Sequence, residues 1–581
     1  MNIDSFNRKL NKKLNREFNG KFKAELKDKI IRVTGKSDDW NEIIKACQMC
    51  VYRKDGIHVV NDIEFTGDVI PEMKKPAVED KSLDGEKCDV LIIGGGISGT
   101  SIARELSKWN LKIFLVEKEV DVALGASGRN DGEVHPGVDL HKGYLKTKYI
   151  RKGNHKYDQI SKELGVPFRR IGQYVGFTKG YLRPLVWLYA MYKKYIVGIE
   201  DTEIVGKDVI EKKEPALNKD FKFALSNPST GVVCPYGLTI AYAENAVENG
   251  AKVFLSTYVK DINVENKIIK SVETNRGTIY PKIVINAAGV FAEEIAKMAE
   301  DRFYSIHPRR GTDIILDKKT GLRFDTVSTV KEIELKNKSH SKGGGLIKTA
   351  HDNVLVGPDA VETYKKEDYQ TTPESMDTLY NKQQITMPSL SRSEAITYFT
   401  GVRAPNFEED FVIEKGRNTK NLIHCAAIQS PGLTTAPAVA LDIEKMTIEL
   451  LKESGEVIEK NENYNPVRKH QIPQMSELPA EEREKYIKEN PDYGIIICRC
   501  EQVSKGEILD ALNAPISVPT VDGIKKRVRP GMGRCQGGFC MPTVTKIISD
   551  YLNEPMMNVR KSGADSVLVY GETKGGEINE N

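Results

Sequence analysis

One segment, residues 88–119, constrains the fold of this chain more than any other: CDVLIIGGGISGTSIARELSKWNLKIFLVEKE. An apolar run at 90–93 leads into a G-x-G-x-x-G pattern, a stretch of helical character at 97–109 and a second apolar run at 112–116. This order predicts a strand, a tight turn, a helix and a second strand, which is the βαβ unit that binds dinucleotides. Glycine spacing alone would be weak evidence, but the two strands, the helix and the closing acid make the pattern specific.

Each small residue of this pattern has a mechanical role. Gly94 permits the tight turn, Gly96 lets the backbone approach a pyrophosphate, and Gly99 lets the helix pack closely on the strand. The pyrophosphate would lie at the N-terminus of the helix, where backbone N–H groups and the helix dipole favour an anion. Glu117, at the end of the second strand, is expected to accept hydrogen bonds from ribose hydroxyls. The alternative is a glycine-rich turn without a ligand, and these residues do not distinguish NAD from FAD.

Three later segments extend the pattern. A loop of small residues contains Ser127, the strand KIVINAAG ends in Gly289, and HCAAIQSPGLTTAPAVALDIEKM combines a strand, a glycine turn and the start of a helix. In this order the pieces resemble the D-amino-acid-oxidase-like superfamily of FAD enzymes across residues 87–450. The resemblance implies FAD as the cofactor, and as its binding residues Gly94, Gly96, Gly99, Glu117, Ser127, Gly289, Gly432, Leu433 and Thr434.

Within that superfamily, the segments SGRNDGEVHPG, TGVRAP and IQSPGLTTAP are similar to anaerobic glycerol-3-phosphate dehydrogenase large subunits and to L-2-hydroxyglutarate oxidase-like proteins. The implied fold is mixed α/β, a Rossmann-like FAD-binding domain with an inserted antiparallel-sheet substrate domain at about 170–400. A helix that starts at 432–435 also has a physical use, because its positive dipole end would stabilise the negative charge of a reduced flavin.

A set of four cysteines lies near the end of the chain. Cys498 and Cys500 form C-x-C, and after a gap of 34 residues Cys535 and Cys540 form C-x-x-x-x-C. The first pair is too closely spaced for the usual C-x-x-C zinc knuckle, and nearby glycines leave backbone N–H groups free to bond cluster sulfurs. The segment resembles the bacterioferritin-associated-ferredoxin-like domain, which implies that the four thiolates bind a [2Fe–2S] cluster. Structural zinc and free thiols are the alternatives.

A flavin next to a one-electron cluster indicates that the two cofactors carry out different electron-transfer steps. The flavin takes two electrons as a hydride, and the cluster passes them on one at a time. An oxidase that reduces oxygen directly needs no cluster, so the pair favours a dehydrogenase with a separate electron acceptor. That acceptor is expected to be a partner flavoprotein, a redox protein or a quinone-linked subunit. A non-catalytic electron-transfer subunit is the alternative from another functional class.

Oxidation of an alcohol releases a hydroxyl proton, and the group that takes it is expected to be a histidine because of its near-neutral pKa. His135 in EVHPG and His351 in KTAHDNVLVGP rank above His307, which precedes Pro308. The alternative for each of them is a structural histidine that makes its hydrogen bonds within the core.

An anionic substrate needs fixed cations. Arg403, in TGVRAP, matches the substrate-anion arginine of the resembled family, and Lys348 and Arg310 are secondary candidates whose alternative is an ordinary surface charge. The chain has Pro136 and Lys348 where relatives commonly have Ala and Pro, close to the expected substrate site. These differences leave the identity of the substrate open. Glycerol 3-phosphate is the first expectation, and a 2-hydroxy acid such as 2-hydroxyglutarate and an amine or N-alkyl amino acid are the alternatives.

The first 67 residues are expected to form a separate module. Apolar residues four apart across residues 1–30 predict two short amphipathic helices with a break at Gly20. These helices either pack on a core with a solvated Lys face, which is favoured, or contact anionic lipid. The following segment reads as strand, turn, helix and strand and resembles the small BON domain. Cys47 and Cys50 in its helix are expected to be buried small hydrophobic residues and not a redox pair.

The remaining divisions follow from composition. Charged, proline-containing stretches are interpreted as linkers, and the expected order is 1–67 N-terminal module, 68–87 linker, 88–450 oxidoreductase domain, 451–492 charged linker, 493–556 [2Fe–2S] domain and 557–581 tail.

Composition also excludes several classes of protein. Lys and Arg total 86 against 82 Asp and Glu, which argues against a nucleic-acid binder. No apolar run approaches the ~20 residues that span a bilayer, and no secretory signal is apparent. Nine cysteines, an odd number, favour thiols or metal ligands over a disulfide framework. The expected location is the cytoplasm, with peripheral contact at the inner face of the membrane as the alternative.

Overall fold

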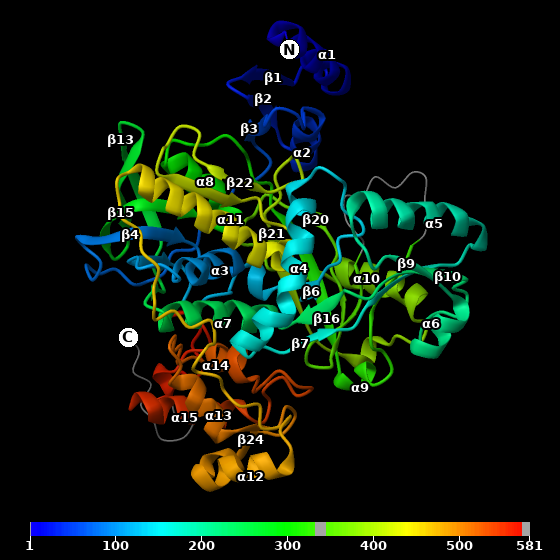
Figure 1. Ribbon diagram of the computed structural model, residues 1–581, viewed down its shortest axis with the longest axis vertical. Coiled ribbons are helices and arrows are strands. Elements are labelled where there is room, and N and C mark those ends of the chain that lie inside the picture. The colour runs from blue at the N-terminus through cyan, green and yellow to red at the C-terminus, as the bar shows by residue number, and fades with distance from the viewer. Residues whose placement is uncertain (1, 332–343, 572–581) are drawn as a thin grey trace.

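The computed structural model describes residues 2–331 and 344–571. Figure 1 shows the N-terminal module at one end of the molecule and the C-terminal domain at the other. Between them lie a parallel-sheet layer covered by helices and, beside it, a large second sheet. No helix in the described ranges is long and apolar enough to cross a membrane.

The parallel-sheet layer contains the predicted βαβ unit. Strand β4 (Glu86–Ile93) leads into α3 (Ile97–Leu106), and the chain returns through β5 (Ile113–Val116), which pairs parallel to β4. The strand order is β12-β5-β4-β15-β14-β13, and β23 pairs parallel to β15. The added strands are β12 (Lys252–Phe254), β13 (Val259–Glu265), β14 (Ile268–Thr274), β15 (Gly277–Asn286), β22 (Val412–Lys415) and β23 (Leu422–Ala426). The predicted Rossmann-like arrangement is confirmed.

The central strands are buried on both faces, which explains their continuous apolar sequence. Ile92 and Ile285 pack against α3 and α11 (Gly432–Glu453), while Leu91 and Val284 pack in the cluster on the opposite face. Helices α4 (Leu145–Leu164), α7 (Pro235–Glu248) and α8 (Ala292–Met298) complete the covering layers. The carboxyl ends of β4, β15 and β23 therefore meet at one edge, where a doubly wound fold binds its ligand.

The inserted sheet is predominantly antiparallel, as predicted. Its order is β20-β16-β19-β18-β17-β8-β10-β9, with β21 on β16, and only β17–β8 is parallel among the described pairs. Its strands are β8 (Gln173–Phe177), β9 (Glu203–Gly206), β10 (Phe223–Asn227), β16 (Arg309–Leu316), β17 (Val327–Val330), β18 (Gly345–Lys348), β19 (Val354–Gly357), β20 (Val361–Glu362) and β21 (Ala395–Arg403). Helix α10 (Pro373–Thr386) contributes to the core on one face.

The N-terminal module corrects one prediction. Helix α1 (Ile3–Phe18) forms, but the predicted second helix is strand β1 (Phe22–Lys27), which pairs with β2 (Ile30–Ser37). Residues four apart share a face in a strand as well as roughly in a helix, and here burial alternates at every second residue. Strand β2 then pairs with β3 (His58–Phe65) beyond helix α2 (Trp40–Met49), as the rest of the pattern predicts.

The core of this module accounts for its cysteines and its amphipathic helix. Cys47 and Cys50 are both fully buried, which confirms their predicted role as small hydrophobic residues. Burial raises the pKa of the Cys50 thiol to about 12, so the thiolate needed for redox chemistry is disfavoured. The apolar face of α1 is occupied too, because Leu14 and Phe18 lie in the same core. This packing supports the favoured interpretation of α1 as a core helix with a solvated Lys face.

The C-terminal domain is small and helical. It contains β24 (Ile496–Cys498), β25 (Val503–Ser504), α13 (Lys505–Leu512), α14 (Val521–Val528) and α15 (Met541–Leu552) around one apolar cluster. Two elements lie within the stretch interpreted as a charged linker: the last turn of α11 and the exposed helix α12 (Ala480–Glu489). The intervening chain runs along the oxidoreductase layer, where the Arg468 guanidinium donates to Glu244.

Candidate active site and iron–sulfur centre

The turn between β4 and α3 has the close packing that its glycines predict. Gly94 has a φ of +114°, a conformation that favours glycine, and a Cβ on Gly99 would lie 1.9 Å from the Gly94 carbonyl oxygen. Gly96 is the N-cap of α3, and the Ile97 N–H donates to the Ser127 hydroxyl over 2.8 Å. Ser127 therefore fastens the small-residue loop to the start of the helix, as expected of a phosphate cradle.

The space beside this cradle fits a bound dinucleotide. The half-buried Glu117 carboxylate accepts the Gly95 N–H at 2.6 Å and the Glu119 N–H at 2.9 Å. Its oxygens retain capacity for further hydrogen bonds, such as those from ribose hydroxyls. A Cβ added at Gly125 or Gly289 would meet no atom within 4 Å, so both loops border open space. The chain thus provides a helix N-terminus, an acid and two unobstructed loops on the same edge of the sheet.

The start of α11 lies close to the His135 loop. The Thr434 hydroxyl accepts the His135 N–H over 2.9 Å, and the Tyr157 hydroxyl donates to the Leu433 carbonyl over 2.6 Å. A Cβ on Gly153 of α4 would lie 2.1 Å from the Thr434 carbonyl oxygen, so α4 and α11 are in close contact. The predicted cofactor residues at the start of α11 and the predicted base are therefore brought together.

The His135 side chain is oriented by a carboxylate. Its Nδ1 lies 2.9 Å from a Glu133 oxygen, and both residues are buried. Asp131 completes a group whose ligand atoms lie within 4.8 Å of one another. A carboxylate on one ring nitrogen holds the ring in place and leaves the other nitrogen available for proton transfer.

Arg403 reaches the same region from the inserted sheet. It ends β21 directly opposite Arg309 of β16, and its guanidinium donates to the Asp359 carbonyl over 3.0 Å. A Cβ on Gly401 would lie 2.2 Å from the Arg129 carbonyl oxygen, so the loop that carries His135 crosses β21 here. Burial lowers the pKa of Arg403, and the nearby acids Asp313 and Asp131 oppose that effect. Asp131 is thus close to both the His135 cluster and Arg403.

The four predicted cluster ligands converge in the C-terminal domain. The Cys500 and Cys535 sulfurs are 3.6 Å apart, and the Cys540 thiol shares a hydrogen bond with Cys498. Although burial opposes it, the pKa of Cys535 is lowered by the backbone N–H groups of residues 537–539 and by Cys500. N–H groups directed at a sulfur are the environment that an iron–sulfur cluster requires. The thiol set and its glycine-rich loop therefore fit the group.

Comparison with protein families agrees with both sites. The model described as "FAD dependent oxidoreductase" matches residues 89–446, and that described as "BFD-like [2Fe-2S] binding domain" matches residues 496–550. The chain belongs to the FAD-dependent oxidoreductase family. It binds FAD in the larger region and a [2Fe–2S] cluster in the C-terminal domain.

Individual relatives of this oxidoreductase carry related names. It is 39% identical over 488 residues to a glycerol 3-phosphate dehydrogenase of Caloramator mitchellensis, covering 84% of this chain and 99% of the relative. It is 25% identical to anaerobic glycerol-3-phosphate dehydrogenase subunit A1 of Haloferax volcanii, covering 78% and 81%. A solved structure of FAD-bound L-α-glycerophosphate oxidase from Mycoplasma pneumoniae superposes with a TM-score of 0.59 at 26% identity, covering 66% and 98%.

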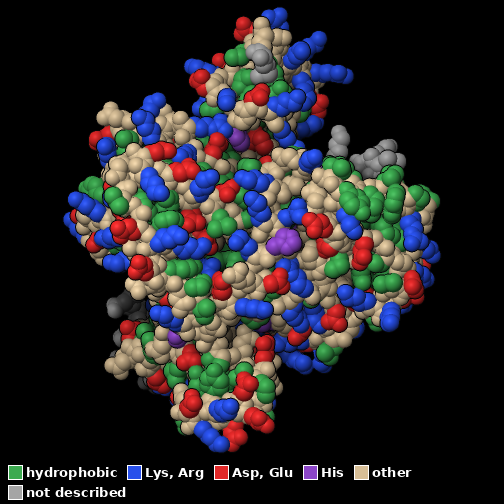
Figure 2. All heavy atoms as spheres, viewed as in Figure 1, with side chains coloured by type: hydrophobic (Ala, Val, Ile, Leu, Met, Phe, Trp, Pro, Cys, Tyr) green, Lys and Arg blue, Asp and Glu red, His purple; other side chains and the backbone are tan. Residues whose placement is uncertain are grey.

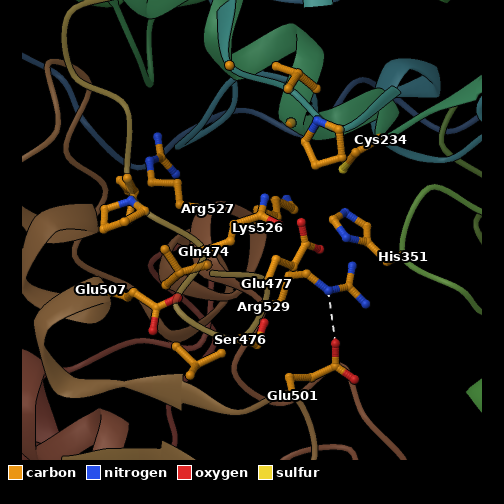
Figure 3. A pocket seen from close by; sticks show the side chains of 18 of the residues that line it. Cys234, His351, Gln474, Ser476, Glu477, Glu501, Glu507, Lys526, Arg527 and Arg529 are labelled. Carbon is orange, nitrogen blue, oxygen red and sulfur yellow. Dashed lines mark hydrogen bonds and ion pairs between the residues drawn. The ribbon is translucent and has the colours of Figure 1, made fainter. Parts of the chain in front are cut away.

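Two predicted residues lie elsewhere in the oxidoreductase. The buried Lys348 ammonium donates to the Gly321 carbonyl and to Asp325, so its charge is already partnered. His351 lines a cavity of about 120 Å³ that is bordered by the C-terminal domain, and burial lowers its pKa well below the usual range. Figure 3 shows His351 beside Cys234 at this cavity. In the described ranges, no hydrogen bond or ion pair joins either side chain to His135 or Arg403.

The other two candidates have structural partners. Arg310 follows Arg309 in β16 and so points to the opposite face, where its guanidinium bonds Asp368 over 3.2 Å. The His307 Nδ1 lies 2.9 Å from Glu362, and its ring stacks on Phe407. Among the predicted site residues outside the cofactor set, His135 and Arg403 share a neighbour in Asp131 within the described chain.

The structure adds acids that sequence reasoning missed. Asp313 is buried beside Arg403, and burial raises the pKa of its carboxyl well above the usual range. One of its oxygens has no hydrogen-bond partner among the described residues. A single acid within an apolar strand, RRGTDIIL, was the available signal. Asp131 and Glu133 were also overlooked, although they stand four and two residues before His135, respectively.

A tyrosine connects the two redox regions. Tyr236, at the start of α7, has its Cβ 3.7 Å from the position that a Cβ on Gly128 of the cofactor loop would occupy. Its hydroxyl lies 3.2 Å from the Met532 sulfur in the loop before Cys535, and it accepts a hydrogen bond from Arg529 over 2.9 Å. Arg529 also bonds Glu501, the neighbour of Cys500, over 3.0 Å (Figure 3). The C-terminal domain is thereby held against the cofactor side of the oxidoreductase.

Proposed function

We propose that this oxidoreductase oxidises glycerol 3-phosphate at its secondary alcohol to dihydroxyacetone phosphate and passes the electrons through the cluster to a separate acceptor. The observation that carries the proposal is a carboxylate-held histidine at the start of α11, together with a half-buried arginine that shares the neighbouring acid Asp131 with it. The names of the relatives support the choice of substrate. When bound, FAD supplies the acceptor for the hydride and the cluster supplies one-electron steps.

His135 is proposed as the general base. Glu133 engages Nδ1, so Nε2 is the nitrogen that takes the hydroxyl proton as the alcohol becomes a ketone. The hydrogen bond from the His135 N–H to Thr434 fixes the backbone of this loop relative to α11. The ring is therefore held by its side chain and by its main chain, as a positioned base requires.

Arg403 is proposed to bind the phosphate. A half-buried guanidinium offers several donors to an anion and is partly desolvated in advance, which strengthens the attraction. Asp313 lies beside it, but the raised pKa of that carboxyl favours its neutral form. A neutral Asp313 does not offset the positive charge of Arg403, which suits a substrate with a phosphate group.

The test is anaerobic bleaching of the flavin by candidate substrates in the holoenzyme. Glycerol 3-phosphate should bleach it, whereas L-2-hydroxyglutarate and N-methylglycine should not. His135→Gln should slow bleaching by roughly 10²-fold or more because the positioned base is lost. His141→Gln, an exposed histidine on the same stretch of chain, is the matched control and should leave the rate unchanged. If only one of the other compounds bleached the flavin, that compound and not glycerol 3-phosphate would be the substrate.

A further inference from the structure

The second sheet carries an unusually apolar surface on helix α5 (Arg183–Met191) and the adjoining π-helix η3 (Tyr192–Val197). Figure 2 shows hydrophobic side chains gathered over this part of the molecule, at the right of the view. We call the exposed set the α5 surface; its members are Tyr181, Leu185, Trp187, Leu188, Tyr189, Tyr192, Tyr195 and Ile196. Leu185 is 60% exposed, Leu188 59% and Tyr195 72%, although residues of these types are usually buried.

The opposite side of α5 is fixed to the core. Val186 and Ala190 are buried in a cluster with Val138 and residues of β8 and β10. The Tyr189 hydroxyl donates to the Val138 carbonyl over 2.7 Å, and the buried Lys193 ammonium donates to the Leu140 carbonyl. The helix is therefore anchored on one face while its outer face is also apolar. A helix that is apolar on all sides is expected to bury its outer face against a second apolar environment, such as a partner protein or a membrane.

The composition around this surface identifies that environment. Residues 179–199 contain no Asp or Glu, and Lys179 and Arg183 are exposed beside the apolar residues. Five of the eight members of the α5 surface are Trp or Tyr, the side chains that favour the boundary between lipid headgroups and acyl chains. Aromatic and aliphatic residues in a segment whose charged residues are all cations are complementary to an anionic bilayer, which attracts the cations and buries the apolar groups. Asp139, Glu200 and Glu203 are among the acids near this segment.

We propose that the α5 surface binds the headgroup–acyl boundary of an anionic lipid bilayer. Helix α1 is basic and amphipathic, but its apolar face is occupied by the N-terminal core, so it leaves this role to α5. Because α5 contacts the carbonyls of Val138 and Leu140, the bilayer would lie close to the loop that follows His135. The proposal is independent of the substrate.

The test uses the full-length holoenzyme and vesicles of phosphatidylcholine with or without phosphatidylglycerol. The enzyme should sediment with the anionic vesicles and much less with the neutral ones, and high salt should weaken binding. The double variant Trp187→Ser/Leu188→Ser should reduce partitioning at least tenfold. The matched control is Leu322→Ser/Val457→Ser, which removes two apolar side chains that are each 86% exposed elsewhere, and should bind as the native chain does.

A spectroscopic measurement on the native chain makes the test independent of variant folding. The chain has three tryptophans, and the difference in emission between native enzyme and Trp187→Phe isolates Trp187. Its emission should shift to the blue with anionic vesicles and be quenched by nitroxide-labelled lipid. Absence of vesicle binding, equal binding by the double variant, or an unquenched Trp187 would overturn the proposal. A dimer that the double variant dissociates, without vesicle binding, would instead assign the surface to contact between copies.

Discussion

Charge at the substrate side is controlled by single buried side chains. His135 is paired with Glu133, and Arg403 lies beside Asp313, whose pKa is raised by burial. An acid with a raised pKa stays neutral at pH values where an ordinary carboxyl is ionised. Ionisation of Asp313 therefore makes the net charge next to Arg403 more negative, and this gives the proposed site a pH dependence that can be measured.

Asp313→Asn should remove the ionisation of residue 313 while leaving the other titratable groups of the site in place. In the native enzyme, KM for glycerol 3-phosphate should rise as pH increases through the pKa of Asp313, because the new negative charge repels the substrate. The Asn variant is isosteric and cannot ionise, so its KM should change little over the same range. A folded-state pKa above the unfolded value also means that stability is lost as pH rises, and the variant should lose less of it.

Steady-state kinetics and denaturant unfolding at several pH values check both statements. Matching pH profiles for native and variant enzymes would show that Asp313 is not the titrating group. At this scale local spacing in the sequence predicts the glycines and the cysteines, whereas His135 and Arg403 are predictions that rest on the family resemblance. The importance of Asp313 could not be predicted, since its burial arises from the pairing of β16 with β21, about 80 residues later in the chain.

Elements meet at this site through close contacts between backbones. The crossing of α4 and α11 is possible only because residue 153 has no side chain. The βαβ unit was predictable in detail, since its apolar runs and glycines are consecutive in sequence. Strand β1 was mistaken for a helix because a spacing of four residues fits both periods. Contacts between elements that are distant in sequence, such as α4 with α11, have no comparable local signal.

Gly153→Ala should move α4 away from α11. The new methyl group would lie 2.1 Å from the Thr434 carbonyl oxygen, a backbone atom that cannot rotate away. Overpacking of this kind costs about 1–3 kcal/mol, and the start of α11 should shift with it. We expect a lower melting temperature and reduced retention of FAD on gel filtration. Gly563→Ala, where a Cβ meets no atom within 4 Å, should behave as the native chain does.

Tyr236→Phe tests the link between α7 and the cluster loop. Loss of the hydroxyl leaves the buried Arg529 without one of its partners, at a cost of about 1–3 kcal/mol. Flavin reduction by substrate should be unchanged, while reduction of the cluster should slow several-fold in stopped-flow measurements. Tyr551→Phe removes a hydroxyl that bonds within the C-terminal domain and is the control. Equal effects of the two variants would indicate a general loss of stability.

The whole molecule combines a two-electron region with a one-electron region. The thiols of Cys498, Cys500, Cys535 and Cys540 come together from segments on either side of α13 and α14. Domain order was predictable because each region contains its own ordered set of residues. The docking between the two regions could not be predicted, because it depends on the complementarity of their surfaces and not on residue spacing within either segment.

Cys535→Ser should disconnect the two regions. Serine is a poor ligand for an iron site that prefers thiolate, so iron and sulfide content should fall. Substrate should still bleach the flavin in a single turnover, turnover with the natural acceptor should collapse, and an artificial two-electron acceptor should restore much of the rate. Cys47→Ala, in the N-terminal core, should retain the iron. Normal turnover with the natural acceptor would place the cluster off the electron path.

The ion pair between Arg527 and Asp121 has a consequence for how such enzymes evolve. The two side chains belong to different domains, are 2.8 Å apart and are almost completely buried. Losing one partner of a buried ion pair leaves the other charge buried without a counter-charge, which strongly destabilises the folded protein. A C-terminal domain from another lineage would therefore fail on this chain unless it arrived with a matching cation. A change at residue 121 of this chain therefore calls for a compensating change at residue 527, so the ion pair links the permissible substitutions of the two parts.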